Sequence, residues 1–257
     1  MLNFDNLYES IKNYKNILIS ILDEIKYRIS IVKLSALHKK IEKEILVLNC
    51  PLKHINSNYI LLDTKHLEVL PHYGVFLKSA IRAFDSYPHI IFLDDNKESL
   101  NFARTTLDGA LCIIETYFFN VSNQQMSSEK YKFTSISLNF VLDRIKGINA
   151  IENALLSYKN LLIDGGVIFG VTIAGDTNHK IKAKNYINEK NKQNYWFNLD
   201  TKLENLETIF KKHFDEYHID IVGSCIIFRL FIHKIPIDIN KYKLTLENVG
   251  DKYIELN

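Results

Sequence analysis

The fold is decided by residues 67–77, which read Leu67-Glu68-Val69-Leu70-Pro71-His72-Tyr73-Gly74-Val75-Phe76-Leu77. The apolar run predicts a short strand over residues 66–70, and the apolar residues after Gly74 predict a helix over 75–84. A strand that turns through a short loop into a helix is the usual setting of a nucleotide-type cofactor loop. Glycines are expected there because they let the backbone approach a ligand, but Leu70 and His72 carry side chains.

Strands and helices alternate after this stretch. Further helices are expected over residues 98–107, 148–161 and 203–214. Further strands are expected over 90–93, 112–115, 133–140, 166–172, 219–222 and 225–231. This order predicts an α/β fold with a doubly wound, mostly parallel seven-stranded sheet, and the two closing strands predict a terminal antiparallel hairpin. The Asn- and Lys-rich residues 178–194 show no clear apolar face.

The first fifty residues predict helix, because apolar residues recur at three- and four-residue spacing from Leu7 to Ile25 and less regularly to Ile45. We expect two packed helices rather than one rod. The predicted domains are a helical extension over residues 1–57, acting as a cap or a dimerisation surface, and a Rossmann-like α/β domain over 58–257. The alternative role for the extension is a lid over a substrate pocket.

The composition excludes several classes. A formal charge of +2 gives no electrostatic reason to expect nucleic acid as a partner. The three cysteines, Cys50, Cys112 and Cys225, are widely spaced, which disfavours a disulfide framework or a cysteine-based zinc site and predicts a cytoplasmic protein. No histidine pair has metal-ligand spacing, so no metal is predicted. No apolar run is long enough to span a membrane, and no signal peptide is expected.

Three stretches resemble the class I S-adenosylmethionine-dependent methyltransferases of the small-molecule type, over roughly residues 67–231. In that family the first strand leads into Glu/Asp-x-Gly-x-Gly-x-Gly. Here Glu68 takes the acidic place, Leu70 and His72 replace the first two glycines, and Gly74 keeps the third.

The second stretch, residues 92–100, resembles the end of the family's second strand, where Asp94 matches the acid that holds the ribose hydroxyls. The alternative to ribose binding is that this acidic stretch only caps the next helix, with Asp95 or Asn96 as the N-cap. Residues 133–147 resemble the fourth strand and its loop. Residues 161–170 resemble a turn in which Gly165-Gly166 leads from a helix into the fifth strand.

The chain also departs from the family. Thr134 stands where an acid is usual, and Asp143 stands where related enzymes often carry a histidine near the acceptor. The contact to adenine falls on either Glu115 or Tyr117.

The resemblance implies methyl transfer from S-adenosylmethionine to the nitrogen or oxygen of a small-molecule acceptor. It implies catalytic roles for Asp143 and Asn139, with Asp143 orienting an amine, taking a hydroxyl proton or only capping the next segment. The implied cofactor-binding residues are Glu68, His72, Gly74, Asp94, Asp95 and Asn139.

The altered loop leaves an alternative open. A histidine at position 72 must either occupy cofactor volume or rotate away, and Pro71 fixes a backbone angle. The alternative is a catalytically degenerate member, acting as a scaffold or partner subunit or as a non-methylating cyclase. The N-terminal helices would then join a homo- or hetero-oligomer. A basic cluster between Lys180 and Lys192 is either a solvated loop or a surface for an anionic acceptor.

Overall fold

The computed structural model describes residues 4–80, 87–118, 131–175 and 179–232. The chain divides into two compact units, residues 1–40 and 41–257, and each is described by itself. The predicted boundary after residue 57 is not tested by this division and stays a prediction.

The first unit is helical. The expectation of two helices was wrong, because a single helix, α1 (Phe4–Val47), covers the segment. No proline or glycine interrupts residues 4–47, so nothing in the sequence breaks the backbone hydrogen-bond ladder. Leu18, Leu22, Ile25, Ile29 and Val32 are between 47% and 71% exposed. In the described part of the chain, no helix is long and apolar enough to cross a membrane.

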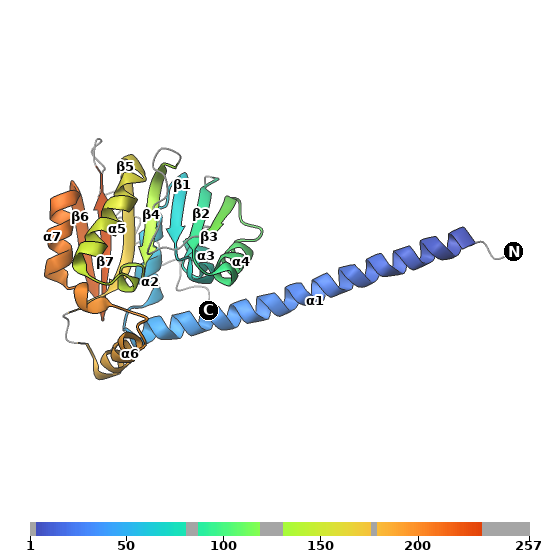
Figure 1. The fold of residues 1–257 in the computed structure, drawn as a ribbon, viewed down its shortest axis with the longest axis horizontal. Coiled ribbons are helices and arrows are strands. Elements are labelled where there is room, and N and C mark those ends of the chain that lie inside the picture. The colour runs from blue at the N-terminus through green and yellow to red at the C-terminus, as the bar shows by residue number, and fades with distance from the viewer. Residues whose placement is uncertain (1–3, 81–86, 119–130, 176–178, 233–257) are drawn as a thin grey trace. The chain divides into compact units, whose positions relative to one another are not determined.

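The second unit contains one seven-stranded sheet in the order β3-β2-β1-β4-β5-β7-β6, which Figure 1 shows from right to left. The pairs from β3 to β5 are parallel, and β7 pairs antiparallel with both β5 and β6. The predicted doubly wound sheet with a terminal hairpin is confirmed. The strands are β1 (Lys65–Val69), β2 (His89–Asp94), β3 (Ile113–Phe118), β4 (Phe133–Asn139), β5 (Leu162–Ile173), β6 (Glu216–Val222) and β7 (Cys225–Phe231).

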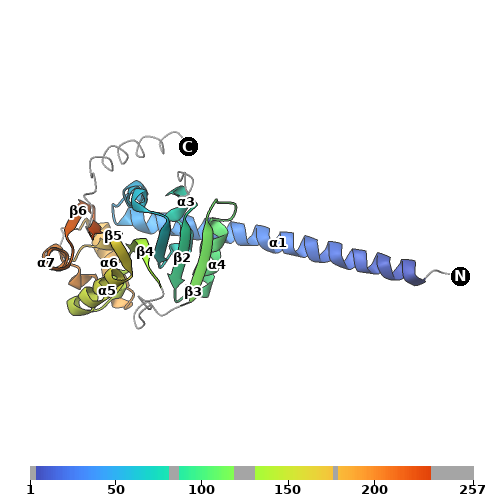
Figure 2. The ribbon, with the colours of Figure 1, turned by 90° about the horizontal axis from the view of Figure 1, so that it is seen from above.

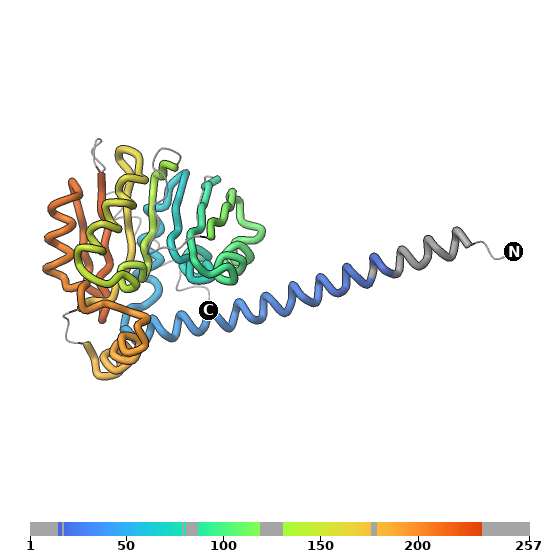
Figure 3. Tube along the Cα trace, viewed as in Figure 1, coloured from blue at the N-terminus to red at the C-terminus, as the bar shows by residue number. Residues whose placement is uncertain are grey.

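The chain begins this sheet near its centre, with β1 between β2 and β4, and winds outward in both directions (Figure 3). The carboxyl ends of β1, β2 and β4 therefore meet at one edge. In open α/β sheets this edge, where the strand order reverses, is the usual place for a ligand.

Helices cover both faces of the sheet. One apolar cluster joins the sheet to η1, α3 and α4, and the other joins it to α5 and α7. The helices α5 and α7 lie side by side in both views (Figures 1 and 2). The helical elements of this unit, besides the end of α1, are α2 (Leu52–Asn56), η1 (Ser57–Leu61), η2 (His72–Gly74), α3 (Leu77–Ala80), α4 (Lys97–Thr106), η4 (Leu142–Arg144), α5 (Ile148–Asn160), α6 (Ile181–Lys192), η5 (Asn198–Asp200) and α7 (Leu203–His213).

Two local expectations needed correction. Gly165 and Gly166 lie inside β5 and not in the turn before it, and Gly165 has φ of +79°. The register of β4 with β5 shifts between Phe133 and Ser135. The glycine pair lies in the part of β5 opposite this shift, where the strand is irregular. Part of the Asn/Lys-rich stretch forms α6, which buries Ala183 and Ile187 on one face.

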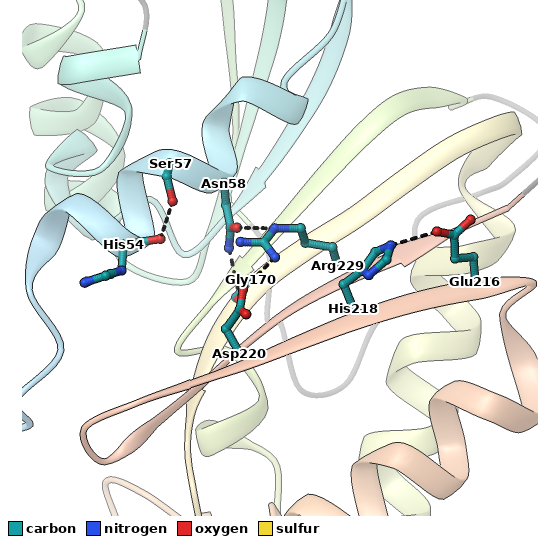
Figure 4. A network of polar contacts seen from close by, with 8 residues as sticks. All are labelled: His54, Ser57, Asn58, Gly170, Glu216, His218, Asp220 and Arg229. Carbon is teal, nitrogen blue, oxygen red and sulfur yellow. Dashed lines mark hydrogen bonds and ion pairs between the residues drawn. The ribbon is translucent and has the colours of Figure 1, made fainter. Parts of the chain in front are cut away.

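A polar network holds η1 against the sheet (Figure 4). Arg229 Nε donates to Asn58 Oδ1 at 2.8 Å, and its guanidinium pairs with Asp220 at 2.8 Å. Asn58 Nδ2 in turn donates to the backbone oxygen of Gly170 at 3.5 Å. The residue after Asn58, Tyr59, is thereby fixed over the centre of the sheet.

Candidate functional site

The loop after β1 has a left-handed backbone at several positions, of which only one is a glycine. Leu70, His72 and Tyr73 have φ of 53°, 48° and 61°, and Gly74 has φ of 78°. A left-handed backbone is uncommon for residues with a side chain. A Cβ on Gly74 would lie 2.9 Å from Thr106 of α4, so this position also requires glycine for packing. The backbone of this loop is therefore left-handed at four positions, three of which carry side chains.

The His72 side chain turns toward β4. Its Nε2 donates to the backbone oxygen of Asn139 at 3.0 Å. The ring lies edge-on to Phe76 and Phe140, with centroids 5.4 and 6.0 Å away. Burial, and then the nearby Arg144 charge, lower the pKa of His72 to about 4. The imidazole is therefore neutral at pH 7 and bridges the ends of β1 and β4.

Glu68 is fully buried, and both of its carboxylate oxygens have protein partners. Tyr59 donates to Oε1 at 2.7 Å, and His66 Nε2 lies 3.1 Å from Oε2. The other nitrogen of His66 lies 2.8 Å from Ser135 Oγ. Burial, followed by the Glu68 charge, raises the pKa of Tyr59 well above its usual value. We call these contacts the Glu68 network, and all of the side chains in it are buried.

Strand register explains the Glu68 network. His66 pairs with Ser135 and Glu68 with Ser137 across β1 and β4. Alternate residues of a strand share one face, so these polar side chains all point to the same side of the sheet. Asn139, two residues beyond Ser137, follows the same parity and donates from Nδ2 to the Tyr59 hydroxyl at 2.7 Å.

Asp94 lies at the carboxyl end of β2 and is 4% exposed. Its Oδ1 accepts from the backbone N–H of Asn96 at 2.9 Å. Burial raises the pKa of Asp94. Asn96 itself caps α4 by accepting from Glu98 and Ser99, while Asp95 is exposed.

Asp143 is buried and held by β5. Its Oδ1 accepts from the Thr172 hydroxyl at 2.8 Å and from the Ile173 N–H at 2.9 Å. Its Oδ2 is buried and has no protein hydrogen-bond partner. Burial raises the pKa of Asp143 to about 7. The catalytic assignments of Asp143 and Asn139 stay predictions, and the contacts of both side chains are with the protein interior.

The two alternatives for an adenine contact lie together on β3. The Tyr117 hydroxyl donates to Glu115 Oε2 at 2.8 Å, and Glu115 also pairs with His89 at 2.8 Å. The Tyr117 hydroxyl, foremost, lowers the pKa of Glu115. Both side chains lie on the same edge strand, and the choice between them stays open.

A small hollow lies beside His72, with a volume of about 40 Å³. That is room for about three water molecules. Among the described residues no group of three or more acidic, histidine or cysteine side chains is placed to hold a metal. Sequence reasoning missed the hollow's Arg144, Tyr195 and Trp196. Its full lining is Ile41, Glu44, Ile45, Leu48, His72, Phe140, Arg144, Tyr195 and Trp196.

No protein-family model and no curated protein matches the chain. Among solved structures it is similar to an O-methyltransferase family protein from Burkholderia thailandensis, with a TM-score of 0.57, 12% identity, and coverage of 76% of this chain and 59% of that one. It is also similar to the plantazolicin methyltransferase BpumL in complex with S-adenosyl-l-homocysteine, with a TM-score of 0.51, 13% identity, and coverage of 79% and 90%. A SAM-dependent methyltransferase from Aquifex aeolicus gives a TM-score of 0.51 and 12% identity, with coverage of 76% and 97%. These similarities establish the class I methyltransferase fold.

Proposed function

We propose that this protein transfers a methyl group from S-adenosylmethionine to the nitrogen or oxygen of a small-molecule acceptor. The observation that carries the proposal is the loop after β1, which keeps positive φ at Leu70 and His72 although both have side chains. A backbone that follows this path without glycine is strained, by about 1 kcal/mol or more at each position. Retention of a strained path at the ligand edge of the sheet favours a binding role.

The residues fit the donor in part. Asp94 lies at the end of β2, where a carboxylate accepts hydrogen bonds from ribose hydroxyls. Gly74 keeps the close packing of the loop on α4. Glu68 stabilises β1 through its buried partners, because both of its oxygens are already bonded. The imidazole of His72 lies across the loop, and we infer that it rotates away from Asn139 when the donor binds.

When bound, S-adenosylmethionine supplies an electrophilic methyl group on its sulfonium. The chain's contribution is then orientation and exclusion of water, which accounts for much of the rate enhancement in such displacements. The Glu68 network makes the central strands rigid under the loop. Asp143 positions the segment after β4 through its hydrogen bonds to β5. The backbone oxygen of Asn139 accepts the hydrogen bond that holds His72.

A second candidate is a member of this fold that transfers no methyl group. The observation that favours it is the hydrogen bond from His72 to Asn139, beside a hollow of only about 40 Å³. In that case the chain acts as a scaffold or partner subunit, or as a cyclase that reuses the pocket. The exposed apolar side chains of α1 would then serve a homo- or hetero-oligomer.

Calorimetric titration with S-adenosylmethionine and S-adenosyl-l-homocysteine tests the proposal. We expect measurable binding to the wild type and a loss of roughly 10- to 150-fold in affinity for Asp94→Ala, the worth of hydrogen bonds to a charged group. Asp108→Ala is the matched control, because Asp108 is an exposed acid that follows α4. Equal affinities for Asp94→Ala and wild type would remove Asp94 from the site, and absence of wild-type binding would favour the second candidate.

A further inference from the structure

Arg144 is the cation of the hollow beside His72. It is the last residue of η4, the turn that follows β4, and it is half-buried. Its guanidinium carbon lies 3.9 Å from the ring centroid of Tyr195, and Nη2 donates to the hydroxyl of the same tyrosine. Trp196, only 6% exposed, adds a second aromatic wall. The guanidinium is thus fixed against an aromatic surface.

Arg144 forms no ion pair with a carboxylate in the described part of the chain, although its charge acts at longer range on Asp94 and Asp143. Its Nε is buried and has no protein acceptor. No described carboxylate lies within ion-pair distance of it, although Lys212 and Arg229 form ion pairs elsewhere in the described residues. A buried donor without an acceptor costs stability and calls for a specific explanation. A guanidinium held in this way is suited to an external anion.

The other charged groups around the hollow limit the charge of that anion. His72 is neutral at pH 7 because its pKa is about 4, so it adds no positive charge. Glu44 is the one carboxylate of the lining, and it acts on Tyr186, whose pKa it raises together with burial. Lys190 lies 5.0 Å from the Tyr195 ring centroid, outside the lining. Because Glu44 is hydrogen-bonded to Tyr186, Arg144 is left to a ligand anion, and a second negative charge on that ligand would be repelled by Glu44.

We propose that the hollow is an anion subsite in which Arg144 binds the carboxylate of a small, largely apolar molecule. A guanidinium presents planar donors that match a carboxylate better than a point charge does. The volume of about 40 Å³ has room for a carboxylate group and little more, so the apolar body attached to it extends out of the hollow, and the aromatic and aliphatic lining suits the apolar atoms next to the carboxylate. Identification of this molecule as the methyl acceptor rests on the proposed function, since the hollow shares His72 and Phe140 with the loop site.

Binding in the hollow can be followed by the fluorescence of Trp196, because it is the single tryptophan of the chain and lines the hollow. Tryptophan fluorescence is recorded during titration with benzoate, with the neutral analogue benzamide, and with inorganic phosphate. We expect benzoate to shift the signal saturably, with at least tenfold weaker effects from benzamide and phosphate. Equal responses to benzoate and benzamide would overturn the carboxylate assignment.

Variants assign the response to Arg144. Arg144→Gln should weaken benzoate binding at least tenfold, and Arg144→Lys should retain part of it. Lys146→Gln is the matched control, since it removes an exposed positive charge two residues away. Circular dichroism checks folding; if Arg144→Gln does not fold, the Arg144→Lys titration decides, and an unchanged benzoate affinity in that variant refutes the proposal.

The result is separable from the test of methyl transfer. Loss of benzoate binding in Arg144→Gln, in a protein that binds no S-adenosylmethionine, keeps the subsite and ends its role as an acceptor site. Binding of S-adenosylmethionine without any Arg144-dependent binding of benzoate keeps the proposed methyl transfer and refutes the anion subsite.

Discussion

Glu68 and Asp94 are two acids at neighbouring places in one sheet, and the structure uses them differently. Glu68 lies within β1, is fully buried, and gives both oxygens to Tyr59 and His66. Asp94 ends β2 and contacts the backbone of the turn that follows it. The sequence pattern presents both as cofactor ligands. A motif position thus identifies a place in the fold, while the neighbouring side chains decide which contacts the residue makes there.

The largest expected effect is on folding stability at Glu68. Glu68→Ala should destabilise the protein by about 2–5 kcal/mol, because it leaves two buried partners, Tyr59 and His66, without an acceptor. Glu68→Gln keeps the shape and most hydrogen bonds, so it should cost much less. Asp94→Ala should cost about 1 kcal/mol, since one hydrogen bond to the turn is lost.

Urea denaturation of these variants measures the differences. Equal stability of Glu68→Ala and Asp94→Ala would contradict the contrast between an acid that stabilises the interior and one that does not.

Asp143 is a third buried acid, and it makes the folding stability depend on pH. Its pKa is raised to about 7 in the fold from 3.8, so its stabilisation is complete below about pH 4 and is lost as the pH rises through 7. Asn carries no charge at any of these pH values. Asp143→Asn should therefore gain roughly 2–4 kcal/mol of stability relative to wild type between pH 4 and pH 8.

Thermal or urea unfolding across this pH range checks the prediction. Parallel stability curves for the two proteins would show that the Asp143 carboxyl is ionised normally, and would reopen its role as a proton acceptor.

Much of the fold was predictable from the sequence. The strands have continuous apolar runs and the helices have apolar faces, so their order fixed the sheet and its closing hairpin. The helix α6 was missed because only Ala183 and Ile187 are buried on it, too few to form a visible stripe. The single N-terminal helix was missed because uneven apolar spacing suggested a break that no proline or glycine enforces.

The site was less predictable, because its contacts join distant parts of the chain. Tyr59 reaches Glu68 from a short helical turn that has no motif of its own. Arg144 and Tyr195 are 51 positions apart. Arg144 lies in the stretch that resembles the fourth strand and its loop, but that resemblance assigns it no role, and Tyr195 belongs to no motif. The positive φ at Leu70 and His72 is likewise invisible in the sequence, since side chains there argue for a different backbone.

We propose that the loop after β1 binds the methyl donor and that His72 moves aside when it does. Calorimetric titration of wild type and His72→Gly with S-adenosylmethionine tests it most directly. Glycine accepts φ of 48° without strain and removes the hydrogen bond to Asn139. We predict measurable binding to the wild type and binding up to about tenfold tighter in His72→Gly, the upper end of the net worth of one hydrogen bond. Absence of binding in both proteins would contradict the claim.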